Sequence, residues 1–374
     1  MVPLTIVVSA YNRDDALHAL FESMKSLISP QPVKLVISID NKGTEEVIKT
    51  ANSFDWHLGE KEVVVHQEKL GLIKHFIWVG DQTEKYEHVL FLEDDMYVSP
   101  NMINYALQLI PFFEDDDIVA GASLYNVPYT LNYMPFDKID DGYDNFFFQH
   151  PYWGNIWFKN KWRMFKEYLK SYKVKDDILP GKVAKWHSHS FKKIFIQYLI
   201  ETGRTMVFPY RSLLTNNSIA GIHASEALYA QTPFVSKPNP EVQYRFQSYQ
   251  DANSRYDAFE EIEVAVIKKN NSDLRDVDFE IDTKMNKSRY QKPFVLTVLQ
   301  ADNPEKFFSS NMKPLEISLL LNIQGEGLCL ANSKDIKLTQ SQIRHTFASS
   351  LLSYTNIHRR LALNIFARIF NIIK

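Results

Sequence analysis

Val89-Leu90-Phe91-Leu92-Glu93-Asp94-Asp95 joins a run of four apolar residues to three consecutive acids. The apolar run predicts a short strand that is buried on both faces of a sheet. If the strand alternation continues, Glu93 and Asp95 point to one side and Asp94 to the other. Carboxylates at the end of a rigid buried strand are typical ligands for a hard divalent cation. We therefore predict that Glu93–Asp95 marks a ligand site.

A second acidic run, Glu114-Asp-Asp-Asp117, provides a comparison. It follows a helical pattern and precedes a strand pattern, so we expect a solvated turn there. The position of acids relative to a buried strand, rather than their number, separates the two runs.

The first 125 residues alternate strand and helix patterns. We predict strands at 4–9, 33–39, 62–66, 89–92 and 118–123, and helices at 14–28, 44–53, 75–86 and 101–112. This order predicts an α/β fold with a mixed, mainly parallel sheet flanked by helices. Ligands bind such sheets at the carboxyl ends of the strands, where Asn12, Asp40 and Gln67 also lie.

The rest of the chain gives weaker patterns. We expect a long loop at 125–151, helices at 152–172 and 182–202, and a strand at 206–209. Beyond about residue 240 we expect a hairpin within 257–282 and strands at 293–299 and 315–323. The domains predicted are 1–235 (donor half 1–125, acceptor half 126–235), an α+β elaboration at 236–355 and a basic amphipathic helix at 356–374.

The composition restricts the class of protein. With 45% hydrophobic and 23% charged residues, the 374-residue chain has the composition of a globular protein. Its net charge of −3 argues against nucleic-acid binding. The lone cysteine, Cys329, excludes an internal disulfide. No signal peptide or apolar run of transmembrane length is recognisable, so we expect a cytoplasmic protein, with a peripheral place on the inner membrane's cytoplasmic face as the alternative.

Several segments together resemble the GT-A nucleotide-sugar glycosyltransferases. They are Val2-Pro-Leu-Thr-Ile-Val-Val-Ser-Ala-Tyr-Asn-Arg13, Val36-Ile-Ser-Ile-Asp40, Glu93-Asp-Asp95 with Val98-Ser-Pro-Asn101, and Pro151-Tyr-Trp-Gly-Asn155. Over residues 2–225 the order of these segments is similar to the N-acetylglucosaminyltransferase I type and to bacterial family 2-like polysaccharide transferases. The resemblance implies a GT-A fold and a nucleotide-sugar donor.

The resemblance also implies roles for individual residues. Asp95 would bind Mn²⁺ or Mg²⁺, while Glu93 and Asp94 would contact the donor sugar and the ribose. The other implied donor-binding residues are Asn12, Arg13, Asp40, Gln67, Gly71, Trp153 and Gly154. The alternatives are structural: Asp40 as a turn residue capping 41–43, Arg13 as a surface residue, Gly71 in an ordinary turn and Trp153 in the core.

The acceptor side departs from the resembled pattern. An inverting transfer needs a general base, and the resembled enzymes place an acid beside a tryptophan, whereas Trp186 is followed by His187-Ser-His189. One of these histidines could be the base, and on a helix the two would point about 200° apart. Asp176 and Asp177 are fallback candidates. His223 would join the metal ligands.

We therefore expect a metal-dependent glycosyltransferase that moves a sugar, preferably from a UDP-sugar, to a glycan or lipid-linked acceptor in cell-surface polysaccharide synthesis, with inversion. Alternatives are a retaining transferase, a sugar nucleotidyltransferase and an inactive sugar-binding scaffold. The helix at 356–374 is expected either to lie on an anionic membrane or to pack on the protein, including as a homodimer contact.

Overall fold

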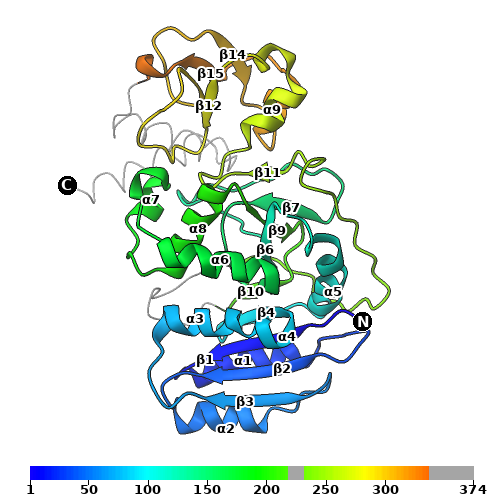
Figure 1. The fold of residues 1–374 in the computed structure, drawn as a ribbon. Helices are drawn as coiled ribbons and strands as arrows, with labels where there is room; N and C mark the ends of the chain where they lie inside the picture. Colours follow the sequence, from blue (N-terminus) through cyan, green and yellow to red (C-terminus); the bar gives the residue numbers. More distant parts are fainter. Residues whose placement is uncertain (218–230, 337–374) are drawn as a thin grey trace, which may run out of the picture. The chain divides into compact units, whose positions relative to one another are not determined.

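The computed structural model describes residues 1–217 and 231–336, which form two compact units (Figure 1). The first unit comprises Met1–Tyr129 and Lys138–Glu260. The second comprises Thr130–Asp137 and the chain from Glu261 onward. The change of unit therefore falls later than the division at 235 expected from the sequence.

A nine-stranded sheet in the order β11-β7-β9-β6-β8-β4-β1-β2-β3 forms the centre of the first unit. The strands are β1 (Thr5–Ala10), β2 (Lys34–Ile39), β3 (Lys61–Val65), β4 (His88–Glu93), β6 (Val119–Ser123), β7 (Asn145–Phe148), β8 (Asn155–Phe158), β9 (Thr205–Pro209) and β11 (Arg255–Tyr256). Strands β4, β1, β2 and β3 are parallel, while β8 pairs antiparallel with β4 and β6. A short antiparallel pair joins β5 (Met96–Val98) to β10 (Leu214–Asn216). The predicted mixed, mainly parallel α/β sheet is confirmed.

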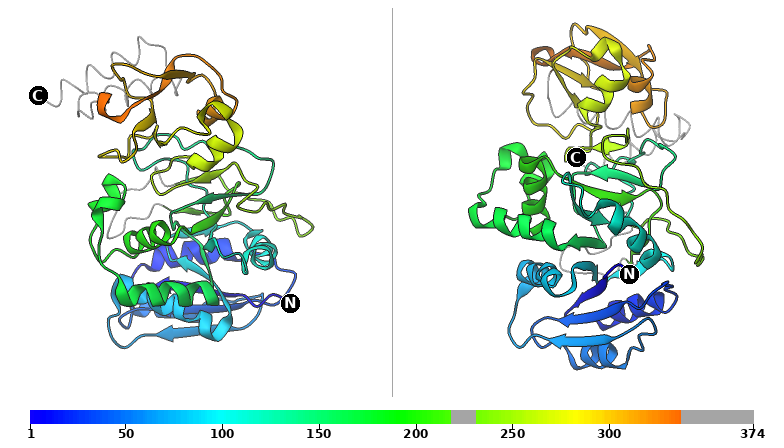
Figure 2. Two further views of the ribbon diagram at one scale, coloured as in Figure 1. Left: turned by 45° about the horizontal axis from the view of Figure 1, so that its top comes forward. Right: turned by 45° about the vertical axis from the view of Figure 1, so that its right-hand side comes forward.

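Helices cover both faces of this sheet (Figure 2). They are α1 (Asp14–Met24), α2 (Glu45–Ser53), α3 (Gly71–Asp81), α4 (Thr83–Tyr86), α5 (Met102–Phe113), α6 (Lys159–Ser171), α7 (Gly181–Ala184) and α8 (Phe191–Thr202). Helices α1 and α2 pack together, with Phe21 stacked on Phe54 at 4.1 Å between ring centres. Helices α3, α6 and α8 share an aromatic core in which Phe191 stacks on Phe76 at 4.7 Å.

Three predicted elements of the first unit are confirmed only in part. The helix expected at 152–172 begins only at Lys159, because Asn155–Phe158 forms a buried central strand between β4 and β6. The helix expected at 182–202 is interrupted between α7 and α8, where the polar residues 186–190 form a turn. The predicted loop at 125–151 contains the buried strand β7.

The second unit is built around a four-stranded sheet in the order β12-β13-β15-β14. Its strands are β12 (Phe279–Asp282), β13 (Phe294–Thr297), β14 (Lys306–Ser309) and β15 (Gly327–Asn332), and its helices are α9 (Val264–Asn270) and α10 (Glu316–Leu320). The predicted hairpin at 257–282 is wrong, because α9 buries Val266 and Ile267. The predicted strand at 315–323 is also wrong, because the segment forms α10 and buries Leu319.

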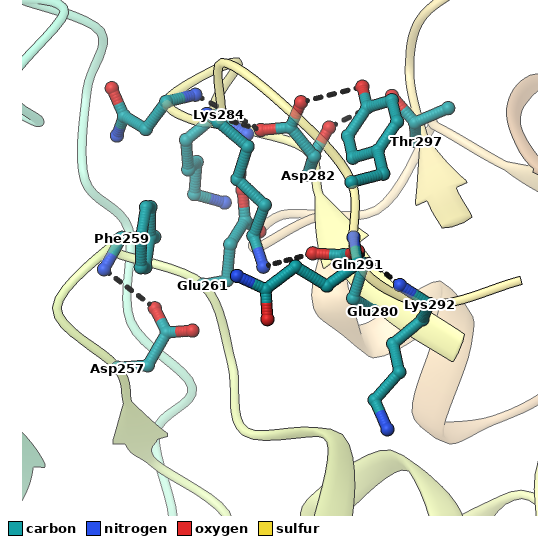
Figure 3. Close-up of polar contacts among 12 residues, drawn as sticks. Asp257, Phe259, Glu261, Glu280, Asp282, Lys284, Gln291, Lys292 and Thr297 are labelled. Atoms are coloured by element: carbon teal, nitrogen blue, oxygen red, sulfur yellow. Dashed lines mark hydrogen bonds and ion pairs between the residues drawn. The ribbon is translucent and has the colours of Figure 1, made fainter. Parts of the chain in front are cut away.

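Buried carboxylates hold the loop that joins β12 to β13 (Figure 3). Asp282 accepts hydrogen bonds from the Asn286 N–H at 3.0 Å and from the Tyr290 hydroxyl at 2.9 Å. Glu280 accepts one from the Lys292 N–H at 2.9 Å, and Glu261 accepts one from the Thr283 hydroxyl at 2.6 Å. The bonds from Asn286 and Lys292 satisfy backbone N–H groups of the loop, and those from Thr283 and Tyr290 satisfy side-chain hydroxyls.

Within 1–217 and 231–336, no helix is both long enough and apolar enough to cross a membrane. The helix predicted at 356–374 lies outside the described residues.

Candidate functional site

The acidic triplet lies where β4 ends. Ser9 of β1 is paired in register with Glu93, the last residue of β4, and Asp94 and Asp95 form the turn that leads into β5. Strand alternation therefore stops at Glu93, so it does not determine the sides to which Asp94 and Asp95 point. Glu93 is thus the last residue of the strand, whereas Asp94 and Asp95 have the backbone conformation of a turn.

Arg13 binds both aspartates of this turn. Its guanidinium donates to the two oxygens of Asp94, and its Nη1 lies 3.0 Å from Oδ2 of Asp95. Arg13 directly precedes α1 and is half-buried, so these charge-assisted bonds form in a partly desolvated setting. Burial opposes the charge of Arg13, but the two carboxylates outweigh it and raise its pKa. Arg13 therefore lies against the acidic turn rather than on the free surface, while its predicted contact with a donor stays a prediction.

The carboxylates of the triplet differ in their acidity. Burial and the charge of Asp95 raise the pKa of Glu93 to about 7, although Lys192 lowers it. Burial raises the pKa of Asp94 to about 6, against the opposing effect of Arg13. Strongly raised pKa values in a cluster of acids are typical of sites that bind a cation or another ligand.

Lys192, on α8, is a residue of this site that the sequence reasoning missed. Its ammonium lies 4.9 Å from the ring centre of Trp153 and 5.9 Å from that of Tyr152. Burial lowers the pKa of Lys192, and the negative charges of Glu93 and Asp95 oppose this shift. The available signal was a lysine at the start of the helix that follows the turn at 185–190.

Asp40 and Gly71 meet at the end of β2. The carboxylate of Asp40 accepts hydrogen bonds from the Leu70 N–H at 2.7 Å and from the Gly71 N–H at 2.9 Å, at the start of α3. The side chain therefore caps α3, which is a different structural role from the capping of 41–43 considered above. Asn12 and Gln67 are exposed near the same strand ends, and Gln67 donates to the Val65 carbonyl at 3.3 Å.

Gly154 fits its place because it lacks a side chain. Its φ of +66° lies in the left-handed region, and a Cβ there would lie 2.1 Å from Cδ2 of Leu214. The carbonyls of Trp153 and Gly154 both accept from the Leu124 N–H, at 3.2 and 3.0 Å. The loop is thereby fixed against β6, with the half-buried Trp153 ring next to Lys192.

His187 and His189 are not on a helix, so their expected 200° separation is wrong. Both are exposed on the turn before α8, with ring centres 5.2 Å apart, and His187 Nδ1 accepts from the His189 N–H at 3.2 Å. Among the described residues, neither histidine has a hydrogen bond or ion pair with the acidic triplet. His223 lies outside the described residues.

The residues present suit a metal ion that a ligand helps to bind. Over the described ranges, no group of three or more His, Cys, Asp or Glu side chains is arranged to hold a metal. Asp95 nevertheless has a buried Oδ1 without a hydrogen-bond partner, which is uncommon for a carboxylate. Mg²⁺ is typically bound by one or two carboxylates together with substrate phosphates. Asp95 fits that pattern.

Sequence comparison defines the class of this site. Residues 5–179 match the family described as Glycosyl transferase family 2. This segment contains Arg13, Asp40, the acidic triplet and Trp153-Gly154, so the match includes the site described above. The expected GT-A type of fold is thereby confirmed for this part of the chain.

Individual relatives are more distant. The chain is 26% identical over 137 residues to the alpha-1,3-mannosyl-glycoprotein 2-beta-N-acetylglucosaminyltransferase of Arabidopsis thaliana, a match that covers 32% of this chain and 30% of that relative's length. Among solved structures, S. aureus TarS 1–349 with UDP-GlcNAc has 13% identity and a TM-score of 0.37, covering 59% of this chain and 60% of that one. The mannosyltransferase PcManGT of Pyrobaculum calidifontis, with GDP-Man and Mn²⁺, has 14% identity and a TM-score of 0.32, covering 45% and 46%.

Proposed function

We propose that this protein is a metal-dependent glycosyltransferase that moves a sugar from a nucleotide-sugar donor, preferably a UDP-sugar, to a glycan or lipid-linked acceptor. The observation that carries the proposal is the triplet Glu93–Asp95, at the end of a central strand of a family 2 domain. Cell-surface polysaccharide synthesis is the context we propose, from the resemblance to bacterial polysaccharide transferases. Inversion at the anomeric carbon is the proposed outcome.

The chain's own residues would bind and orient the donor. Asp95 would hold Mn²⁺ or Mg²⁺ through its unpartnered oxygen, and the ion would withdraw charge from the donor diphosphate as a Lewis acid. Arg13 holds Asp94 and Asp95 in fixed positions, which spares the site reorganisation when the donor arrives. Asp40 and Gly71 would lie beside the nucleotide.

A retaining transferase is the second candidate, and one observation favours it. Both histidines next to Trp186 are exposed on a turn and have no hydrogen bond or ion pair with the triplet among the described residues. A retaining reaction does not need a base at that place. The anomeric configuration of the first product, measured by NMR, separates the two mechanisms.

Ligand-induced thermal stabilisation tests the proposed function. We expect one of UDP-, GDP-, dTDP- or CMP-sugars to raise the melting temperature in the presence of Mn²⁺, because a ligand at ~100 times its Kd stabilises the folded protein by about 2.7 kcal/mol. Asp95→Asn should abolish the Mn²⁺-dependent part of the shift, whereas Asp115→Asn, in the exposed acidic turn, should leave it unchanged. Full Mn²⁺-dependent stabilisation of Asp95→Asn would show that another residue holds the metal.

A further inference from the structure

Lys192 is a cation that has no hydrogen-bonded or ion-paired anion among the described residues, although Glu93 and Asp95 act on it at longer range. Arg13 is bonded to Asp94 and Asp95, but the ammonium of Lys192 has no hydrogen bond and no ion pair within 4 Å among residues 1–217 and 231–336. An ammonium carries three N–H donors, and a half-buried one costs free energy unless these find acceptors. The position is therefore suited to an anionic ligand.

The surroundings of Lys192 fix where that ligand would lie. The rings of Trp153 and Tyr152 lie against the ammonium at 4.9 and 5.9 Å and hold it by cation–π attraction. Glu93 and Asp95 are close enough to act on its charge. Lys192 thus lies against the Trp-Gly loop and within electrostatic range of the carboxylates where we place the metal.

The start of α8 adds to this positive potential. Lys192 is the second residue of a 12-residue helix with no acid in its first turn and no side-chain hydrogen bond from the preceding Ser190. The N-terminus of a helix carries a partial positive charge that favours anions.

We propose that Lys192 binds a terminal oxygen of the donor's diphosphate and compensates the charge that builds there as the sugar leaves. This proposal rests on the function proposed above. In the transfer, the bond between the anomeric carbon and the β-phosphate oxygen breaks, and its electron pair stays on that oxygen. The acceptor oxygen forms the new bond to the anomeric carbon and gives its proton to a base. Lys192 keeps its proton throughout and donates a hydrogen bond to the diphosphate.

Titration with nucleoside mono- and diphosphates tests this assignment. Calorimetry of the full chain with Mn²⁺ would compare UMP with UDP, and likewise the guanine, thymine and cytosine pairs, for the wild type and for Lys192→Met. We expect Lys192→Met to lose about 10- to 100-fold in affinity for the preferred diphosphate, the effect of one charge-assisted hydrogen bond. Affinity for the matching monophosphate should change less than about threefold, and Lys192→Arg should retain most of the diphosphate affinity.

The controls separate this role from a structural one. Lys170→Met removes an exposed lysine that is ion-paired with Glu167 on the same helix, α6, and this variant should bind both nucleotides as the wild type does. Lys192→Gln replaces Lys192→Met if the latter melts at a lower temperature without ligand. Unchanged diphosphate affinity in the neutral variant, or an equal loss for mono- and diphosphate, overturns the role of Lys192. A wild type that binds none of these nucleotides overturns the proposed function and this proposal with it.

Discussion

The carboxylate of Asp40 accepts a hydrogen bond from the backbone N–H of Gly71 at 2.9 Å, which joins the end of β2 to the start of α3. The other carboxylate oxygen of Asp40 accepts a hydrogen bond from the Leu70 N–H at 2.7 Å. A residue at the expected nucleotide-binding edge of the sheet therefore also caps a helix. The two roles make separate predictions.

Replacing Asp40 by alanine should lower the free energy of unfolding by about 1–3 kcal/mol, because two N–H groups of α3 lose their acceptor. Asp40→Asn keeps one carbonyl oxygen and should lose about half as much. Urea unfolding without nucleotide measures this, with the exposed Asp55→Ala as the control. If Asp40→Asn binds the nucleotide as tightly as the wild type, Asp40 caps the helix only and does not contact the base.

The pair Gly154 and Gly71 separates backbone strain from steric fit. Both have a left-handed φ, +66° and +70°, but a Cβ at Gly71 would meet nothing within 4 Å, whereas one at Gly154 would meet Leu214. We expect Gly71→Ala to cost about 1–2 kcal/mol of stability from the conformation alone, and Gly154→Ala a further ~1–3 kcal/mol from overpacking.

A double-mutant cycle checks the steric part. Leu214→Ala destabilises the protein by itself, but it should make Gly154→Ala less costly, since the clashing methyl group is gone. Additive costs in the cycle would mean that Leu214 does not determine why glycine is needed at 154.

The acidic triplet could be predicted from the sequence because its signal is local. Four apolar residues followed by three acids predict both the strand and its end. The acids at 114–117 could be distinguished from the triplet because they follow a helical pattern instead of a buried strand. The structure bears this out, since Phe113 ends α5 and Asp116 accepts from the Ile118 N–H in a turn.

Contacts over long sequence separations could not be predicted. Arg13 reaches Asp94 across 81 residues, and Lys192 meets Trp153 only because α8 packs beside the Trp-Gly loop. The strand Asn155–Phe158 was mistaken for helix because its apolar residues fit either periodicity, and only pairing with β4 and β6 decides between them. Local patterns thus predicted the acids at the end of a strand, but not Lys192 and not the contacts that Arg13 makes with Asp94 and Asp95.

His75 should make the first unit less stable in acid. Burial lowers the pKa of His75 to about 4, and its ring accepts or donates a 2.7 Å hydrogen bond with Ser38. Because the unfolded chain takes up this proton near pH 6.5 and the folded one only near pH 4, stability is complete above 6.5 and falls between 6.5 and 4. The full effect is on the order of 3 kcal/mol.

His75→Gln should reduce this acid sensitivity, and denaturant unfolding at several pH values measures it. The exposed His18→Gln is the matched control and should leave the slope unchanged. If the free energy of unfolding of His75→Gln depended on pH as it does in the wild type, another group would cause the acid sensitivity.

Asp282 should give the second unit the opposite pH dependence. Burial and the nearby charge of Glu261 raise the pKa of Asp282 to about 7, although Tyr290 and Lys287 oppose the shift. The folded chain therefore holds a proton that the unfolded chain releases near pH 4, so this contribution to stability is complete below pH 4 and is lost as the pH rises to 7. In Asp282→Asn, the amide oxygen can still accept from the Asn286 and Lys287 N–H groups, and the amide N–H can donate to the Tyr290 hydroxyl. This variant should therefore become more stable than the wild type at pH 8, by roughly 1–4 kcal/mol. Amide hydrogen exchange of β12 and β13 (Figure 3) measures the stability of this unit by itself.

Glu280→Gln, on the same strand, is a control in which the pH dependence should have the opposite sign. Burial would raise the pKa of Glu280, but the hydrogen bonds from Lys287 and from the loop N–H groups outweigh burial and lower this pKa. It should therefore destabilise the unit more at pH 8 than at pH 4, and equal pH slopes in the two variants would contradict the assignment to Asp282.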